Sequence, residues 1–423
     1  MEKTIIIAIV SFLWFLCSSV TAEPVVLTGE MLPELIGSSI SSVRITRMDG
    51  VSLPFQIDEM NERGEYILPS GDEPNAHEAT GKLKAQDEIV FLWDDTDSLL
   101  TPSVDLYRSQ VVTLSRGSTK RAVIISTDTT VEKSPVTYIR YDHKTQSLKT
   151  PYFYADFAMD RFHFNRAGVL DFETGEFIDL TEELRVDILF RALWGLIPIR
   201  YDEENIVCVV RRYKVGPVRL IRRGDFHLNL GMGVKGSRAA VDQICYPQMV
   251  KVPVNVHVPF RFRSFFSQAY IEMTPVMGAQ GNHFTFKIPQ IGFARPFSAG
   301  TTDTLLELNP DQELFTVTNG SSGYGWLLQT TMDSSLLEGS GFVFRKPSSR
   351  GGIGESGYRL TVRNVPRGYY HIVNWVIFST GSRESIAQGA RALSEPVKIF
   401  IDNRTLSGKL NTLRSVLDLE DDQ

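Results

Sequence analysis

The sequence predicts an all-β protein, built as an antiparallel β-sandwich assembly with an amphipathic helix close to its C-terminus. Many short runs alternate apolar and polar residues and end at turn residues, a pattern typical of sandwiches rather than of alternating strands and helices. Near the C-terminus, leucines recur at spacings of four, three and four, which makes one apolar stripe on a helix. These leucines are Leu406, Leu410, Leu413 and Leu417.

Strands are expected wherever the alternating pattern lasts for five residues or so. In the run from His283 to Ile288, for example, Phe284 and Phe286 fall on one face while the polar side chains fall on the other. One face of such a strand meets a core and the other meets water. The expected strands are Val43–Met48, Glu88–Trp93, Val111–Ser115, Ala122–Ser126, Thr137–Tyr141, Ile206–Tyr213, Val218–Arg222, His283–Ile288, Leu314–Thr318, Tyr358–Val365, His371–Phe378 and Val397–Ile401.

One segment, from about Thr181 to Trp194, fits two structures. Thr181 is a suitable N-cap for a helix that follows it. Leu184, Val186, Ile188 and Phe190, however, also alternate at a period of two. Both a second helix and a strand therefore remain open for this segment.

Residues 1–22 have the layout of a secretory signal peptide. Lys3 precedes an apolar run from Ile5 to Cys17, which is too short to span a bilayer, and small residues lead up to Ala22. We expect cleavage after Ala22, export to a periplasm or to the cell exterior, and a mature chain without a transmembrane segment. Export places the protein where disulfide bonds persist, so Cys208 and Cys245 form either a disulfide or two buried free thiols.

Two domains are expected after the signal peptide. A polar stretch from Thr127 to Pro135 separates an acidic, β-rich domain, 23–130, from a larger β-sandwich domain, 131–423, that carries the basic and aromatic-rich segments. Within the first domain, residues 61–86 are polar and rich in Gly and Pro. They are expected to form a long loop, and loops of this length are usually functional or disordered.

Charge is distributed unevenly along the chain. From Asp58 to Asp105 thirteen acidic residues accompany three basic ones, whereas from Arg211 to Arg263 eleven basic residues accompany two acidic ones. The formal net charge of the whole chain is −6. Export and this negative balance disfavour nucleic acid as a partner.

The basic segment suggests a binding site for an anion. Arg222 and Arg223 follow a Gly216-Pro217 turn, and further on Arg261 and Arg263 alternate with phenylalanines. Arginines gathered on one surface match carboxylate or sulfate oxygens in bidentate fashion, and His227 lies in the same segment. We expect either a groove for an anionic ligand, such as an acidic glycan, or a solvated strand face that pairs with the acidic segment.

An aromatic segment, from Tyr152 to Arg166, suggests a sugar site. A pyranose stacks its C–H face on an aromatic ring while nearby polar groups bind its hydroxyls. The alternative is an aromatic core with surface charges. The candidate ligand-binding residues of this segment are Tyr154, Arg161, His163 and Arg166.

Acidic residues supply one candidate metal site. Asp94, Asp95 and Asp97 follow a predicted strand, and calcium prefers such oxygen ligands, but the run lacks EF-hand spacing and equally fits an Asp-rich turn. No other cofactor is expected. The doublets Asp58-Glu59 and Asp87-Glu88 could do glycosidase chemistry only at a suitable carboxylate separation.

Three function classes follow from these observations. The first is an exported, non-catalytic binding protein for carbohydrate or another anionic ligand. The second is a carbohydrate-active enzyme, lyase or epimerase-like, on an acidic polysaccharide, with His163, Tyr154 and His227 as candidate acid and base and the arginines as a carboxylate clamp. The third is an envelope scaffold or assembly protein. No catalytic motif anchors the enzyme class, so the first is preferred.

Overall fold

The structure is a computed structural model. It divides into two compact units, a large unit formed by Leu68–Pro74 and Tyr138–Leu393 and a small unit formed by Pro24–Ile67, Asn75–Thr137 and the described residues from Ser394 on. The sequence placed this division near residue 130. The residues that the structure describes are 23–98, 109–159, 164–228, 239–258, 264–297, 304–307, 314–337, 339–345, 352–395 and 397–402.

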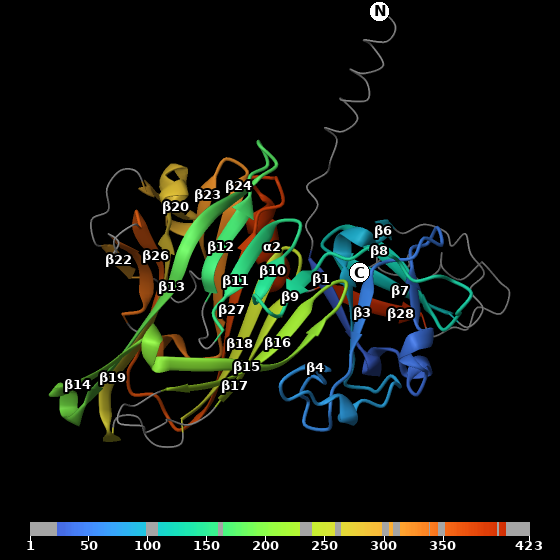
Figure 1. The fold of residues 1–423 in the computed structure, drawn as a ribbon, viewed down its shortest axis with the longest axis horizontal. Helices are drawn as coiled ribbons and strands as arrows, with labels where there is room; N and C mark the ends of the chain where they lie inside the picture. The colour runs from blue at the N-terminus through green and yellow to red at the C-terminus, as the bar shows by residue number, and fades with distance from the viewer. Residues whose placement is uncertain are drawn as a thin grey trace, which may run out of the picture. The chain divides into compact units, whose positions relative to one another are not determined.

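The large unit contains two ten-stranded antiparallel sheets (Figure 1). The strands of the first sheet are β9 (Arg140–Asp142), β10 (Ser147–Lys149), β11 (Phe153–Phe157), β12 (Phe164–Leu170), β13 (Phe177–Ala192), β14 (Ile197–Asp202), β19 (Phe266–Met277), β22 (Thr304–Glu307), β25 (Gly341–Arg345) and β26 (Gly354–Val362). Their order is β22-β25-β26-β19-β13-β12-β11-β10-β9, and β14 also pairs with β13.

The second sheet has the order β21-β20-β23-β24-β27-β18-β17-β16-β15-β4. Its strands are β4 (Ser70–Gly71), β15 (Ile206–Val215), β16 (Leu220–Leu228), β17 (Ala239–Cys245), β18 (Met249–Val258), β20 (Thr285–Ile288), β21 (Phe293–Pro296), β23 (Leu314–Asn319), β24 (Ser322–Thr330) and β27 (Gly368–Phe378).

Aromatic side chains from the two sheets meet in one core. Phe153 of β11 stacks on Phe378 of β27 at a centroid distance of 3.9 Å. Phe342 of β25 meets Phe315 of β23 edge-on at 5.3 Å. Each such pair contributes about 0.5–1.5 kcal/mol beyond the burial of its area. The two sheets therefore form a sandwich.

The small unit contains a three-stranded and a five-stranded sheet. The order is β1-β5-β3 in the first and β2-β8-β7-β28 in the second, where β6 pairs with β8. Their inward side chains, among them Phe91, share one buried core with Trp93, the residue that follows β5. The strands are β1 (Pro24–Thr28), β2 (Arg44–Thr46), β3 (Phe55–Asp58), β5 (Glu88–Leu92), β6 (Asp97–Ser98), β7 (Ser109–Arg116), β8 (Thr119–Ser126) and β28 (Lys398–Asp402).

Helical structure is sparse among the described residues. One α-helix, α2 (Ser385–Ser394), buries Ile386 and Ala390, and Ile386 lies so close to Gly325 of β24 that a Cβ there would be 2.4 Å from its Cγ2. No described helix has the length and apolar character needed to cross a membrane. The short 3-10 helices are η2 (Gly29–Met31), η3 (Pro33–Leu35), η4 (Ile40–Ser42), η5 (Ala76–Glu78), η6 (Trp93–Asp95), η7 (Leu193–Gly195), η8 (Glu203–Asn205), η10 (Ala279–His283), η11 (Pro289–Ile291) and η13 (Ser334–Leu337).

The all-β, antiparallel sandwich prediction is confirmed, and every expected strand overlaps a strand of the structure. The ambiguous segment from Thr181 is part of the long strand β13, in which Leu184, Val186 and Ile188 are buried. The signal peptide, 1–22, and the helix expected over Leu406–Leu417 lie outside the described residues.

The two cysteines are free, which corrects the disulfide alternative. Cys208 pairs with Phe226 and Cys245 pairs with Leu220, so six residues of β16 separate their positions along the sheet. That spacing is about 20 Å, whereas a disulfide needs Cα atoms about 4.4–6.8 Å apart. Desolvation raises the pKa of Cys208 to about 11 and that of Cys245 to about 12.

We expect alkylation of the unreduced protein to label Cys208 and Cys245 quickly after unfolding and slowly in the native state. Both thiols are buried, and at neutral pH their raised pKa values keep them protonated and unreactive. Mass spectrometry of the labelled peptides reads the result. A pair that reacts only after reduction would instead indicate a disulfide.

Candidate functional site

Strand β11 divides its side chains between the core and the outer face of the first sheet. Phe153, Ala155 and Phe157 are buried, whereas Tyr154 and Asp156 alternate with them and are partly exposed. This is the alternation that a strand imposes when one of its faces meets a core. It presents the phenol ring of Tyr154 on the outer face.

Five side chains from β11, β12 and β13 form what we call the tyrosine platform: Tyr154, Asp156, Arg166, Phe177 and Asp179. The Tyr154 hydroxyl donates to Asp179. Arg166 lies 3.4 Å from both carboxylates, and its guanidinium carbon lies 5.3 Å from the Tyr154 ring centroid. Phe177 meets the same ring edge-on at 5.7 Å. The platform thus combines aromatic surface with anionic and cationic groups.

Gly168 of β12 lets the Tyr154 ring lie across the sheet. A Cβ at this position would come within 2.2 Å of the ring atom Cε1. Only glycine leaves room for so close an approach. The position of the ring therefore depends on this residue.

Burial, followed by the hydrogen bond to Asp179, raises the pKa of Tyr154 well above its usual range. The phenol therefore remains a neutral hydrogen-bond donor at physiological pH. A general base needs a pKa near the working pH. Tyr154 consequently does not fit the base role that the enzyme hypothesis gave it.

The arginines of β16 do not line an open groove. Arg222 is only 1% exposed. It donates to Gln146 at 2.7 Å and to Gln243 at 2.6 Å, and its guanidinium carbon lies 3.8 Å from the ring centroid of Phe157. None of the ion pairs between described residues involves Arg222, so amide oxygens and an aromatic face stabilise its charge.

Arg223 points to the opposite face of β16 and is also buried. Its Nε and Nη2 each donate to a carboxylate oxygen of Asp242 at 2.7 Å, which is bidentate pairing within the sheet. His227 is partly exposed on the face of Arg223, four residues further along. The three side chains do not converge, and this corrects the anion groove as far as the structure describes it.

Of the other predicted ligand-binding residues, two lie together and four lie outside the part of the chain that the structure describes. The structure brings Tyr154 and Arg166 together, as the aromatic segment suggested. Arg161, His163, Arg261 and Arg263 lie outside the described residues.

The calcium site is a further correction. Asp94 lies 3.8 Å from Arg121, and Asp97 lies 3.3 Å from Arg47, so arginines already neutralise these carboxylates. Over the described part of the chain, no group of three or more His, Cys, Asp or Glu side chains could hold a metal ion. The run is an Asp-rich turn around η6.

The acidic doublets do come together, because Asp58 and Glu88 face each other across β3 and β5. Their carboxylates bind donors of the small unit itself. Gln56 donates to both oxygens of Asp58, and Tyr66 donates to Glu88. These contacts give the doublets a structural role.

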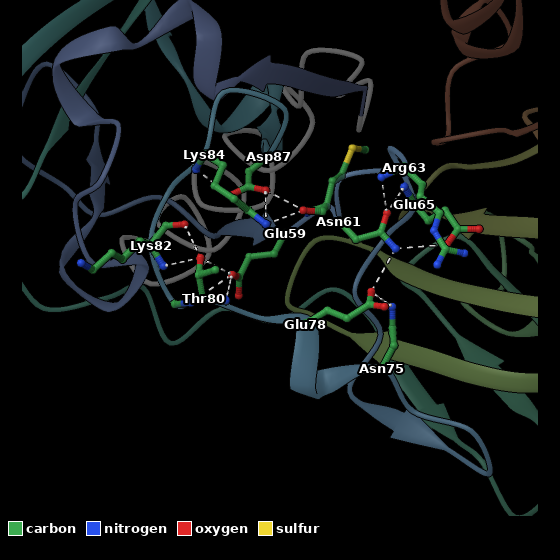
Figure 2. Close-up of polar contacts among 12 residues, drawn as sticks. Glu59, Asn61, Arg63, Glu65, Asn75, Glu78, Thr80, Lys82, Lys84 and Asp87 are labelled. Carbon is green, nitrogen blue, oxygen red and sulfur yellow. Dashed lines mark hydrogen bonds and ion pairs between the residues drawn. The ribbon is translucent and has the colours of Figure 1, made fainter.

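Polar contacts also order the loop between β3 and β5, as Figure 2 shows. Asp87 accepts from the backbone N–H groups of Met60 at 2.8 Å and Lys84 at 2.7 Å, while burial raises its pKa. Asn61 donates to Glu65 and Glu78 at 3.1 and 2.9 Å. The small-unit part of the loop, which we expected to be functional or disordered, is held by its own side chains.

The first sheet also contains a second cluster of charged side chains, which the sequence analysis did not predict. Glu272 of β19 and Glu355 of β26 are at most 1% exposed, and one guanidinium group, that of Arg345, binds both at 2.6 and 2.7 Å. Arg359 also donates to Glu272 at 2.8 Å. Both carboxylates are therefore engaged by arginines in a buried ionic network within the sheet.

An apolar cavity of about 110 Å³ lies between the two sheets, beneath β11. Its walls include Phe153, Phe157, Trp326 and Phe378, and Gln243 is among its few polar residues. The platform and the cavity therefore occupy opposite faces of the same strand.

Some residues of the platform could have been found from the sequence. The Thr174-Gly175 turn joins β12 to β13, and a hairpin at this turn places Asp179 opposite Gly168. Gln146 and Gln243, which accept hydrogen bonds from Arg222, had no recognisable pattern in the sequence. Gln146 lies in the turn between β9 and β10, far from Arg222 in the sequence, and Gln243 lies opposite Arg222 on β17.

No protein-family model matches the chain, and no curated protein matches it. Among solved structures, it is similar to an α-mannosidase from Enterococcus faecalis, with 9% identity, a TM-score of 0.46, and coverage of 86% of this chain and 41% of that one. It is also similar to a glycosyl hydrolase family 38 protein from the same organism, with 9% identity, a TM-score of 0.44, and coverage of 92% of this chain and 46% of that one. The chain thus spans less than half of either protein. At these values the similarities assign no residue and no activity.

We expect Arg222→Ala to lower the free energy of unfolding by about 2–4 kcal/mol, because it removes two buried hydrogen bonds and leaves a cavity beside Phe157. The control is Arg200→Ala. Arg200 has a 69% exposed side chain and pairs with Asp187, so its removal costs about 0–1 kcal/mol. Urea unfolding of the full chain measures both. Equal stability of the two variants would contradict the structural role of Arg222.

Proposed function

We propose that the protein is an exported, non-catalytic carbohydrate-binding protein whose ligand rests on the tyrosine platform. The single observation behind this proposal is the partly exposed Tyr154 ring, flanked by Arg166 and two carboxylates on one sheet face. A pyranose ring can cover the aromatic surface with its C–H groups while its hydroxyls exchange hydrogen bonds with the charged neighbours.

The charges of the platform favour a neutral or weakly charged glycan. Asp156 and Asp179 supply two negative charges, while Arg166 and the neighbouring Lys149, which is not itself part of the platform, supply two positive ones. Lys149 lies with its Nζ 4.9 Å from the Phe177 ring centroid. A strongly acidic polymer would need a surplus of cations, whereas sugar hydroxyls can bind both signs of charge.

Binding without catalysis fits the contacts of the platform's ionisable groups. Hydrolysis of a glycosidic bond needs one carboxyl group that acts as general acid and a second that acts as base or nucleophile. Arg166 binds both Asp156 and Asp179, Asp179 also accepts from the Tyr154 hydroxyl, and the raised pKa of Tyr154 keeps that phenol protonated. The proposal accordingly assigns no turnover to this site.

We expect Tyr154→Ala to weaken glycan binding by about tenfold or more, since the substitution removes the stacking surface. Tyr154→Phe keeps the ring and should lose less. Glycan arrays identify the ligand, and titration calorimetry then compares the variants. Tyr369→Ala is the control, because Tyr369 is an 81% exposed tyrosine of β27 in the other sheet.

Two outcomes would contradict the proposal. One is an array on which no glycan binds, or on which binding ignores Tyr154. The other is chromatographic evidence that the bound glycan is cleaved or epimerised, which would replace a binding protein by an enzyme.

Export is part of the proposal, and it rests on the sequence of the first 22 residues. Glu23 is buried and β1 starts at Pro24, directly after the expected cleavage position. We expect the protein recovered from cells to begin at Glu23, as read by N-terminal sequencing. A mature protein that begins at Met1 would contradict export by this signal.

A further inference from the structure

One end of the large unit exposes a group of large apolar side chains in two adjacent loops. Figure 1 shows this end, where strand β13 ends and strands β14 and β19 begin. Scattered apolar residues are normal on a protein surface, but a contiguous group is not. The exposed side chains are Leu193 (52%), Trp194 (87%), Leu196 (80%), Ile197 (47%) and Phe265 (56%). We call them the apolar tip.

The backbone of the apolar tip is strained. Leu193 has φ +47° and Trp194 has φ +58°, in the left-handed region that bulky side chains rarely adopt. Such conformations are unfavourable for side chains of this size and tend to persist at functional positions. Here the strain accompanies a tryptophan side chain that points to solvent.

The tip is held by the strands beneath it. The backbone N–H of Leu193 donates to the carbonyl of Phe265 at 3.2 Å, which joins the two loops. Just below, the rings of Phe190 and Phe266 lie 5.3 Å apart and pack against a small buried cluster. The exposed side chains therefore project from an ordered base.

The charges around the tip are positive. The stretches 191–199 and 264–270 contain no acidic residue, and Arg191 is exposed at the start of the first. Arg367 is exposed in the loop before β27, whose Val365 belongs to the cluster below the tip. Neither arginine takes part in an ion pair with another described residue.

We propose that the apolar tip docks into the interfacial region of a lipid bilayer that contains anionic lipids. Tryptophan and aliphatic side chains at the end of a narrow hairpin can enter the headgroup region, where tryptophan is favoured. Arg191 and Arg367 complement anionic headgroups at the level of the surface. This inference is independent of the glycan proposal, since the platform contributes no residue to the tip.

Vesicle co-sedimentation tests this proposal with the chain from Glu23 to Gln423, because the apolar run Ile5–Cys17, which includes Trp14, would itself bind vesicles and change its emission. We expect it to bind vesicles of phosphatidylcholine mixed with phosphatidylglycerol, and to bind pure phosphatidylcholine more weakly. The double variant W194S/L196S should lose roughly tenfold or more in affinity. The control is M159S/I291S, which removes two other exposed apolar side chains of the large unit, 63% and 47% exposed.

Tryptophan fluorescence gives a second measurement. Among the tryptophans that the structure describes, Trp93, Trp326 and Trp375 are buried, so an emission shift on adding vesicles reports Trp194. A blue shift that disappears in W194S/L196S, with unchanged circular dichroism, supports the proposal. Absent vesicle binding, or binding that both double variants weaken equally, overturns it. Concentration-dependent dimerisation that only W194S/L196S abolishes also overturns it, in favour of a second copy as the partner.

Discussion

The alternation of side chains along strands whose inner faces share one aromatic core is the constraint on which the large unit depends. The stacked pair Phe153 and Phe378 joins the two sheets and thereby fixes which residues of β11 face inward. Once Phe153 is buried, Tyr154 must face outward. A one-residue slip in register would move the platform into the core and the phenylalanines into water.

The buried arginines of β16 are stabilised in two different ways. Arg223 meets a carboxylate and forms a bidentate pair, whereas Arg222 meets amide oxygens and aromatic rings. Both arrangements use the guanidinium group to join neighbouring strands. The many arginines of this segment are consequently part of its construction, although their abundance in the sequence resembled a ligand site.

The sequence predicted the fold well because alternation is a local signal. The expected strand with Phe284 and Phe286 on one face corresponds to β20, which Phe284 immediately precedes, and both side chains are fully buried. The contact between Tyr154 and Arg166 was also within reach, since β11 and β12 are consecutive. The burial of Arg222 was not, because Leu220 and Ile221 are both fully buried and β16 has no exposed face there to set the pattern. Contacts such as Gln146 to Arg222 depend on tertiary structure.

Strand β28 gives the small unit a particular order of assembly. It pairs with β7 along Lys398–Asp402, although nearly 300 residues of chain lie between the two strands. The ribosome synthesises Tyr138–Leu393 before it reaches β28, so the large unit can fold while the edge of β7 is still unpaired. Truncation before residue 398 would thus leave the five-stranded sheet of the small unit without its edge strand.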